Sequence, residues 1–376
     1  MINKIIKHIS KTFLVFTVSL ILVFTITVGG IKIHRLTLTT RYNFDFLNGQ
    51  ANKVILFVGD GMGENHIKVT ETYCEKDLFF TSFSKQGFVS TSSLDVLKST
   101  DSASTATAFA TGNKVHNGEI SSKNHIDLPI LTDYIKSLGY GVGLVTTDYL
   151  YSETIAAFSS HTENKDNIDE IVSEQITSNV DLFLGKSSKE YVDNKVNFKN
   201  QGYNFVEKFS DLKITNNKII GIFEEIIEKQ NSDSDVTLDR ITDFAVDYME
   251  TNFSDGYLLI VEGGHIDRMA HNSLIFEMIQ YLDNFDYTIN KTYEKLKNDP
   301  SCAIIVTGNH ETGNLKYNGE TKDEINSMNM LLDEGHTLKD VPYFMTFTND
   351  LVNVNQISNI IDNTDIYKIC KALMSK

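Results

Sequence analysis

The sequence predicts an α/β fold, a three-layer sandwich in which a mostly parallel central sheet is flanked by helices. Two observations carry this prediction. Short apolar runs alternate with amphipathic helical segments, and this alternation is typical of a parallel sheet that is covered on both faces. The second observation, a charge-free apolar stretch near the N-terminus, predicts a transmembrane helix that precedes the domain.

The predicted elements follow one another from residue 53. The run "KVILFVGDG" is an apolar strand that ends in Gly-Asp-Gly. Three helix-strand pairs come after it, each an amphipathic segment followed by an apolar run: helix 128–140 with strand 141–147, helix 237–252 with strand 256–264, and helix 276–298 with strand 302–309. No Gly/Ser-rich or Pro-rich linker divides the chain. We therefore expect one domain over residues 51–376, in which the polar, weakly periodic residues 160–235 form a peripheral or inserted segment.

The N-terminus predicts export. Residues 12–31 carry no charge and follow Lys4, Lys7 and Lys11. Such a stretch is long enough for a helix to cross a bilayer, whereas a cleaved signal peptide has a shorter apolar core. We expect residues 1–31 to form a cytoplasmic tip and a transmembrane signal-anchor, and residues 32–50 a juxtamembrane stalk. The body would then lie on the extracellular face of the cell membrane, or be secreted if the segment is instead a cleaved signal.

Charge and cysteine content narrow the function classes. The formal net charge of −16 argues against nucleic-acid binding through the general electrostatic field. An anionic substrate would need local positive charge, and bound metal cations can supply it. The three cysteines are widely spaced, which predicts neither a disulfide framework nor a zinc finger.

Three of the predicted strands end in polar residues. Asp60 and Glu262 close two of them, and Asn309 and His310 follow a third. Because ligands bind beyond the carboxyl ends of parallel strands, we expect these side chains to gather at one edge of the sheet.

The segment "VEGGHIDRMAH" places Asp267 and His271 four residues apart. On a helix these two side chains share a face and can ligate one zinc ion. His336, in the loop "DEGHT", is a candidate third ligand. Taken singly, each histidine is more often a surface or hydrogen-bonded residue.

The segment "STDSASTATAFATG" predicts a helix of small residues capped by Asp101, with Ser102 in its first turn. A helix N-terminus suits a phosphate group, and a serine beside a metal ion can act as a nucleophile. The alternative is a capped, Ala-rich core helix.

Together, these segments resemble motifs of the alkaline phosphatase family, both in their order along the chain and in their residues. The resemblance covers residues 53–348 and rests on "FVGDGMG", "TDSASTATAFATG", "VEGGHIDRMAH", "VTGNHETG" and "GHT". It implies a centre of two Zn²⁺ ions with a nearby Mg²⁺. By resemblance, Ser102 forms a phosphoserine, and the metal ligands are Asp267, His271 and His336 for the first zinc, His310 and Asn309 for the second, and Asp60, Thr154 and Glu262 for the magnesium, with Asp60 bridging to the second zinc.

Two positions depart from the family pattern. Asn309 stands where the family has Asp, so we expect a weakened second zinc or another divalent ion there. Lys165 aligns with the family's phosphate-binding Arg, which Asp101 would orient, and a lysine cannot form the planar two-pronged contact. Ser152 also replaces a residue near the magnesium.

The main hypothesis is an exported, metal-dependent phosphomonoesterase that acts on a small phosphate monoester through Ser102, as a membrane-bound protein that could be a homodimer. A catalytically impaired relative that binds phosphate ligands is the first alternative, favoured by Asn309 and Lys165. A phosphodiesterase of the same superfamily is the second.

Overall fold

The computed structural model describes residues 42–376 apart from 228–231, 233–234, 328–334 and 349–351, and, before residue 42, only the pairs 18–19, 27–28, 31–32 and 39–40. The chain divides into two units, Met1–Phe46 and Leu47–Lys376. In the first unit, β1 (Val18–Ser19) pairs with β4 (Thr39–Thr40), and β2 (Thr27–Val28) pairs with β3 (Ile31–Lys32). Apart from those pairs, the predicted membrane segment 12–31 lies outside the described residues. Among the helices that are described, none is long and apolar enough to cross a membrane.

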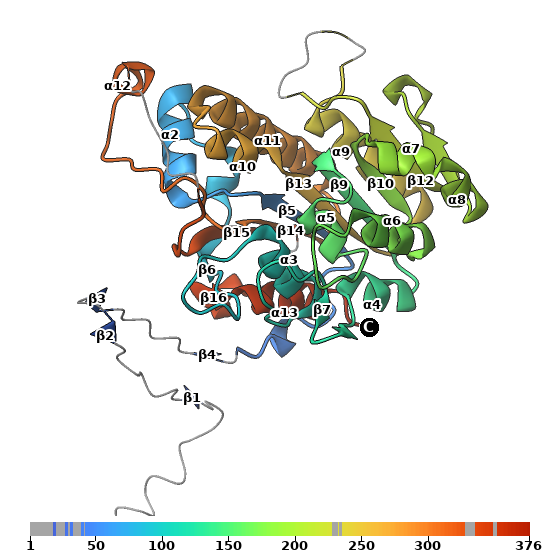
Figure 1. The fold of residues 1–376 in the computed structure, drawn as a ribbon, viewed down its shortest axis with the longest axis horizontal. Helices are drawn as coiled ribbons and strands as arrows, with labels where there is room; N and C mark the ends of the chain where they lie inside the picture. Colours follow the sequence, from blue (N-terminus) through green and yellow to red (C-terminus); the bar gives the residue numbers. More distant parts are fainter. Residues whose placement is uncertain are drawn as a thin grey trace, which may run out of the picture. The chain divides into compact units, whose positions relative to one another are not determined.

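The second unit is built on one sheet of ten strands (Figure 1). In spatial order the strands are β11 (Tyr203–Val206), β12 (Lys218–Phe223), β10 (Leu182–Lys186), β9 (Gly141–Tyr149), β13 (Tyr257–Gly263), β5 (Lys53–Gly59), β14 (Cys302–Gly308), β15 (Val341–Phe347), β6 (Lys85–Ser90) and β16 (Ile360–Asp362). The pairs β14–β15 and β15–β6 are antiparallel, and the other neighbouring pairs are parallel. The prediction of a mostly parallel sheet is therefore confirmed.

Helices cover both faces of this sheet (Figure 1). One layer contains α2 (Glu64–Cys74), α9 (Leu238–Asn252), α10 (His265–His271) and α11 (Ile275–Leu296), which pack on one another through α11. The opposite layer contains α3 (Ser102–Thr111), α4 (Leu131–Ser137), α5 (Glu153–Ala157) and α13 (Asn363–Leu373). Further elements are α6 (Ile168–Thr177), α7 (Lys189–Asp193), α8 (Lys195–Asn200), α12 (Lys322–Ser327), the hairpin β7–β8 (Ser122–Lys123, Ile126–Asp127) and four 3₁₀ turns, η1 (Asp45–Leu47), η2 (Phe79–Ser82), η3 (Phe209–Asp211) and η4 (Val354–Gln356).

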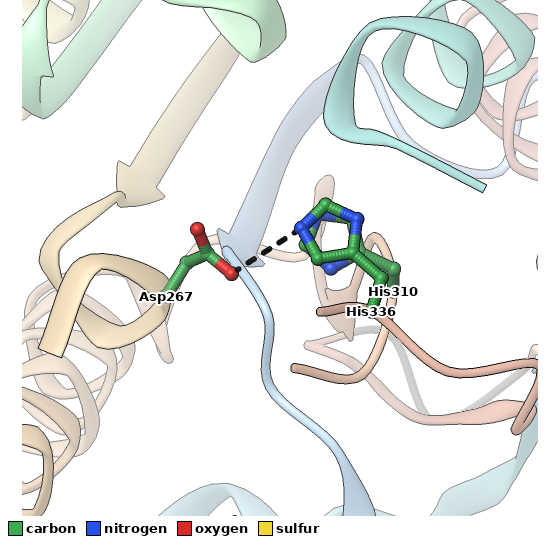
Figure 2. Close-up of side chains that lie close together, drawn as sticks. All are labelled: Asp267, His310 and His336. Atoms are coloured by element: carbon green, nitrogen blue, oxygen red, sulfur yellow. Dashed lines mark ion pairs between the residues drawn. The ribbon is translucent and has the colours of Figure 1, made fainter. Parts of the chain in front are cut away.

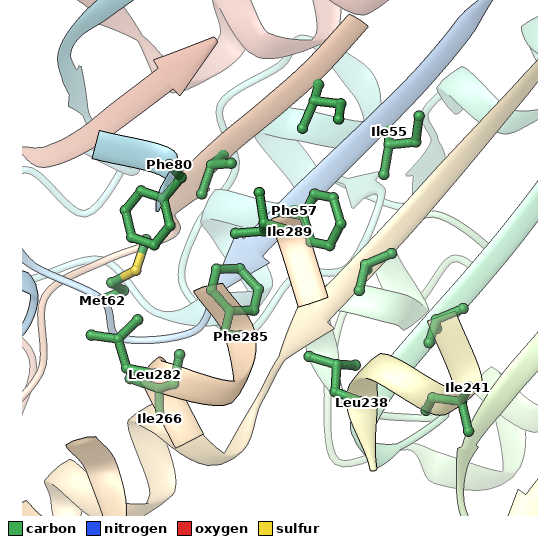
Figure 3. Close-up of a cluster of buried hydrophobic side chains, with 14 of the residues drawn as sticks. Ile55, Phe57, Met62, Phe80, Leu238, Ile241, Ile266, Leu282, Phe285 and Ile289 are labelled. Atoms are coloured by element: carbon green, nitrogen blue, oxygen red, sulfur yellow. The ribbon is translucent and has the colours of Figure 1, made fainter. Parts of the chain in front are cut away.

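The central strands are buried on both faces of the sheet, which explains why their sequences are continuous apolar runs. Every residue of β5 is buried, because helices cover both faces of the sheet at this point. On the α11 face, the Phe57 ring meets the Phe285 ring edge to face at a centroid distance of 5.8 Å. Figure 3 shows these rings among Ile55, Leu282 and Ile289. Large rings and branched chains packed in this way hold the carboxyl end of β5 in a fixed position.

Residues 160–235, predicted to be a peripheral or inserted segment, supply β10, β12 and β11, which extend the central sheet to one of its edges. Their strands are short and are separated by polar helices and turns, which hides the alternation that marks the other strands.

Backbone register brings the predicted site residues to one edge. Gly59 of β5 lies opposite Gly263 of β13 and Gly308 of β14. Asp60 and Asn309 directly follow this level of the sheet, and Glu262 lies one residue before it. This agrees with the sequence-based expectation that they gather beyond the carboxyl ends of the strands.

Candidate active site

Ser102 is the first residue of α3 and lies against side chains from two strand ends. Its hydroxyl oxygen Oγ donates to Asp60 Oδ1 at 3.2 Å and lies 2.8 Å from His310 Nε2. Asp101 caps the helix, because its Oδ1 accepts the Ser104 N–H at 2.9 Å. The Ser102 side chain is thus held where a carboxylate, an imidazole and a helix N-terminus meet.

A second cluster, the histidine cluster, comprises Asp267, His271 and His336. His271 Nε2 lies 3.3 Å from Asp267 Oδ2 and 3.1 Å from His336 Nε2, and His336 Nε2 lies 3.9 Å from Asp267 Oδ1. The structure therefore brings these three predicted ligands together, although His336 is 65 residues away from His271 in the chain. Two imidazoles and one carboxylate form a donor set that suits Zn²⁺.

His310 joins the histidine cluster to Ser102. Its ring stacks on the His336 ring at a centroid distance of 3.7 Å and an interplanar angle of 17°. Figure 2 shows the two rings overlapping, with Asp267 facing them from α10. Ligand atoms of Asp267, His310 and His336 all lie within 4.8 Å of one another. The two halves of the predicted metal centre are therefore adjacent.

The hydrogen-bond partners of the His336 ring determine which nitrogen faces the cluster. Nδ1 lies 2.9 Å from the Thr100 carbonyl oxygen, which can only accept, so Nδ1 carries the proton. Burial lowers the pKa of His336 to about 4, and the ring is neutral near pH 7. Its Nε2 lone pair is then directed at His271 and Asp267 and is available to a cation.

Charges in the site shift the pKa values of two predicted ligands in opposite directions. Burial would raise the pKa of Asp267, but its hydrogen bond with His271 and the charge of His310 outweigh burial and hold the pKa below its usual range. Burial would likewise lower the pKa of His310, yet contact with Asp60 raises it. A proton on His310 and a cation beside it compete for the same negative surroundings.

Glu262 and Thr154 form a separate polar pair below Asp60. Burial and the charge of Asp60 raise the pKa of the Glu262 carboxyl well above its usual value. Thr146 Oγ1 donates to Glu262 Oε2 at 2.5 Å. The Thr154 hydroxyl is close enough to lower the Glu262 pKa, yet its buried oxygen has no partner of good hydrogen-bond geometry among the described residues. A buried carboxylate beside an unpartnered oxygen fits a hard cation such as Mg²⁺.

Asn309 is buried and is oriented differently from the sequence-based expectation. Its amide oxygen Oδ1 accepts the backbone N–H groups of Gly61 at 3.0 Å and His310 at 2.9 Å. Its amide nitrogen Nδ2 donates to Asp60 Oδ1 at 2.6 Å. Rotating the amide would leave both buried N–H groups unpaired, at about 1–3 kcal/mol each. The group that faces Asp60 is therefore an N–H donor, which cannot ligate a cation.

Lys165 lies next to the helix cap of Ser102. Its ammonium nitrogen Nζ is 3.7 Å from Asp101 Oδ2 and 2.8 Å from Glu153 Oε1. Burial would lower the Lys165 pKa, but Glu153 and Asp101 raise it, so the cation is retained. The predicted phosphate-binding residue thus lies beside Asp101, the residue before Ser102, but two carboxylates share its charge.

Comparison with known protein families identifies the family to which this chain belongs. The family model described as alkaline phosphatase matches residues 51–372. The chain belongs to the alkaline phosphatase family. It is a hydrolase of that family, and the match covers all the site residues described above.

Individual alkaline phosphatases are distant relatives. Alkaline phosphatase 4 of Bacillus subtilis is 28% identical over 328 residues, which are 78% of this chain and 71% of that relative. Alkaline phosphatase 3 of the same organism is 27% identical over 70% of this chain, which spans 62% of that relative's length. Alkaline phosphatase of Escherichia coli is 24% identical over 69% of this chain and 70% of the relative.

Solved alkaline phosphatases share the fold. The enzyme of the Antarctic bacterium TAB5 matches with a TM-score of 0.74 and 24% identity, over 86% of this chain and 98% of that one. The cold-active enzyme of Shewanella sp. matches with a TM-score of 0.78 and 22% identity, over 86% and 100% of the two chains. A mutant of the TAB5 alkaline phosphatase holds Mg²⁺ in its M3 site.

Some residues of this alkaline phosphatase site were not singled out from the sequence. Thr312 bonds two predicted metal ligands, Glu153 pairs with Lys165, and Thr146 bonds Glu262. Thr312 lies inside the quoted segment "VTGNHETG", so its closeness to His310 was visible in the sequence. Glu153 and Thr146 carry no local signal, because their partners are 12 and 116 residues away.

Proposed function

We propose that this chain is a metal-dependent phosphomonoesterase that hydrolyses phosphate monoesters through a phosphoserine intermediate at Ser102. The main support is the position of the Ser102 hydroxyl, 3.2 Å from Asp60 Oδ1 and 2.8 Å from His310 Nε2, at the N-terminus of a helix. A hydroxyl in this position can attack the phosphoryl group of a bound substrate.

The donor groups of this chain fit divalent cations unequally. Asp267, His271 and His336 would hold the first Zn²⁺, and Asp60 with His310 would hold a second ion, to which Asn309 contributes no oxygen. Glu262 and Thr154, with Asp60, would hold Mg²⁺. When bound, such cations stabilise the attacking and leaving oxygens of an in-line displacement.

The residues of the chain carry out two displacements. First, Ser102 Oγ forms a bond to phosphorus, the ester O–P bond breaks, and the alcohol departs. Water then attacks the phosphoserine, which releases inorganic phosphate and restores the serine hydroxyl. Asp60 and His310 lie within reach of the Ser102 proton. Lys165 and the N–H groups at the start of α3 would bind phosphoryl oxygens.

Para-nitrophenyl phosphate tests this proposal. The full-length chain supplied with Zn²⁺ and Mg²⁺ should release nitrophenolate and, when quenched with acid, retain labelled phosphate on Ser102. Ser102→Ala should lower turnover by at least about 10³-fold, since removing a nucleophile leaves only the background of binding and electrostatics. Ser160→Ala is the matched control, because Ser160 is also buried and its hydroxyl bonds only to the Ala156 carbonyl among the contacts described.

Two alternative functions predict different results in these hydrolysis experiments. The Asn309 N–H facing Asp60 favours a relative that binds phosphate ligands without turnover. That reading requires phosphate binding with no hydrolysis under Zn²⁺, Mg²⁺, Mn²⁺ or Co²⁺, a result that contradicts the phosphatase proposal. A phosphodiesterase would hydrolyse bis-para-nitrophenyl phosphate faster than the monoester.

Export is a further part of the proposal. Residues 12–31, with the lysines before them, support a signal-anchor that holds the catalytic domain on the extracellular face of the cell membrane. Protease added to intact cells should then degrade the domain, whereas protection would contradict export. A homodimer is proposed as the assembly, and the molar mass in solution tests it.

A further inference from the structure

Thr312 lies between the two halves of the proposed metal centre. Its side chain is buried. The Thr312 hydroxyl oxygen Oγ1 donates to Asp267 Oδ1 and lies 3.1 Å from His310 Nδ1. Its backbone forms an isolated antiparallel bridge with His336, and its N–H donates to the Gly61 carbonyl oxygen at 3.2 Å. One residue therefore contacts three predicted ligands.

The number of protons available determines the direction of both hydrogen bonds of the Thr312 hydroxyl. A hydroxyl has one proton to donate, and an ionised carboxylate can only accept. The Thr312 proton is therefore directed to Asp267. The hydroxyl must then accept the hydrogen bond from His310, so the His310 Nδ1 carries a proton. That leaves the His310 Nε2 directed at Asp60, 3.2 Å away, and at Ser102.

The surroundings give the hydroxyl little freedom to turn. Gly61 has a φ of +69°, and a Cβ at that position would lie 2.6 Å from Asp267 Oδ1 and 2.8 Å from Thr312 Oγ1. The chain thus passes so close to both groups that only a glycine fits.

We propose that Thr312 is a positioning residue shared by both ion sites: its hydroxyl orients the Asp267 carboxylate for the first ion and fixes the His310 ring so that Nε2 faces the second. This inference rests on the proposed metal-dependent function. Groups that orient ligands in this way typically change metal affinity by about 10–100-fold when removed.

Thr312→Val tests the proposal, since valine keeps the shape and removes the hydroxyl. We expect Zn²⁺ affinity, measured on the full-length chain by competition with a chelating indicator, to fall by about 10–100-fold at both sites. The visible absorption spectrum of the Co²⁺ form should also change, because it reports ligand geometry. Thr312→Ser, which restores the hydroxyl, should bring both affinities back to within a few-fold of wild type. Thr312→Ala is measured alongside in case valine prevents folding.

Thr307→Val is the matched control. Thr307 is also buried and lies on β14, and its hydroxyl bonds to the carbonyls of Gly308 and Pro342 rather than to a predicted ligand. This variant should lose stability but keep the metal affinity of wild type.

The outcomes separate the two proposals. If the wild-type chain binds Zn²⁺ at two sites and Thr312→Val or Thr312→Ala binds both ions unchanged, or loses only one, the shared positioning role is wrong. Serine that fails to restore binding also contradicts it. A wild-type chain that binds no divalent ion overturns the proposed function itself, and the role of Thr312 with it.

Discussion

The two halves of the active site differ in what already surrounds their ligand atoms. In the histidine cluster, His271 Nε2 lies 3.3 Å from Asp267 Oδ2 and 3.1 Å from His336 Nε2. In the other half, a single oxygen, Asp60 Oδ1, contacts Ser102 at 3.2 Å, Asn309 Nδ2 at 2.6 Å and His310 Nε2 at 3.2 Å.

This difference indicates how one amide, that of Asn309, would alter a proposed metal site without altering the fold. A cation entering the histidine cluster meets a carboxylate, the His336 Nε2 lone pair and the His271 imidazole, whose Nε2 proton can be released when a cation binds. A cation entering beside Asp60 must compete with the Asn309 N–H, which the backbone of Gly61 and His310 holds in place. We therefore expect the histidine cluster to bind its ion more tightly than the Asp60 half.

Removing the carboxylate of the histidine cluster should have the largest effect. Asp267→Asn keeps the side-chain shape but removes the negative charge between His271 and His336. Loss of a ligand should exceed the effect of losing an orienting group, so we expect at least about a 100-fold fall in Zn²⁺ affinity. Turnover of para-nitrophenyl phosphate should fall with it. Elemental analysis of the purified protein and steady-state kinetics measure the two effects.

Asp286→Asn provides the control for this change. Asp286 is a buried carboxylate on α11 that accepts the Phe80 N–H at 3.1 Å and lies outside the site. It should lose stability without losing metal. Equal metal content in the wild type and Asp267→Asn would show that the histidine cluster is not the tight site.

Asn309→Asp should make the two halves more alike. One carboxylate oxygen can keep the Gly61 and His310 N–H groups, and the other then faces Asp60. Two carboxylates so close repel each other when no cation is bound, so the metal-free protein should unfold at a lower temperature. The metal-bound protein should be more stable, because the second ion should bind at least about tenfold more tightly. Thermal unfolding with EDTA and with Zn²⁺ measures both changes.

Asn309→Ala separates the added charge from the lost amide. It frees Asp60 from the N–H but adds no ligand, so its metal affinity should rise less than that of Asn309→Asp. If the aspartate variant binds the second ion no better than wild type, the amide does not limit this site.

The fold could be predicted from the sequence because its central strands carry strong local signals. The run at 53–61 is β5, and the predicted helix-strand pairs correspond to α4 with β9, α9 with β13, and α11 with β14. Residues 160–235, predicted to be a peripheral or inserted segment, form the β10–β12–β11 end of the sheet, and their strands carry weaker signals because they are short and are separated by polar helices and turns. Their place at the edge of the sheet depends on long-range pairing, which periodicity does not reveal.

The sequence was enough to predict which residues form the site, but not how their side chains are oriented. Residues such as Asp60 and Ser102 follow from strand ends, a helix cap and the family resemblance, and the structure places them in contact. The direction of the Asn309 amide depends on two backbone N–H groups whose positions only the folded chain defines. The pairing of Lys165 with Glu153 likewise depends on how α5 packs beside α3.

We expect the smallest effect from changing the Lys165–Glu153 pair. This change affects the proposed phosphate-binding residue and leaves the predicted metal ligands unaltered. Glu153→Gln removes the carboxylate that lies 2.8 Å from Lys165 Nζ, so the ammonium becomes freer to bind phosphate. Both side chains are partly exposed, and such pairs contribute up to about 1 kcal/mol, so inhibition by inorganic phosphate should strengthen by no more than about fivefold. Metal content should stay the same. Glu294→Gln, which breaks the Glu294–Lys297 pair at the end of α11, should leave phosphate inhibition unchanged. Weaker inhibition in Glu153→Gln would mean that Glu153 orients Lys165 toward the phosphate rather than competing with it.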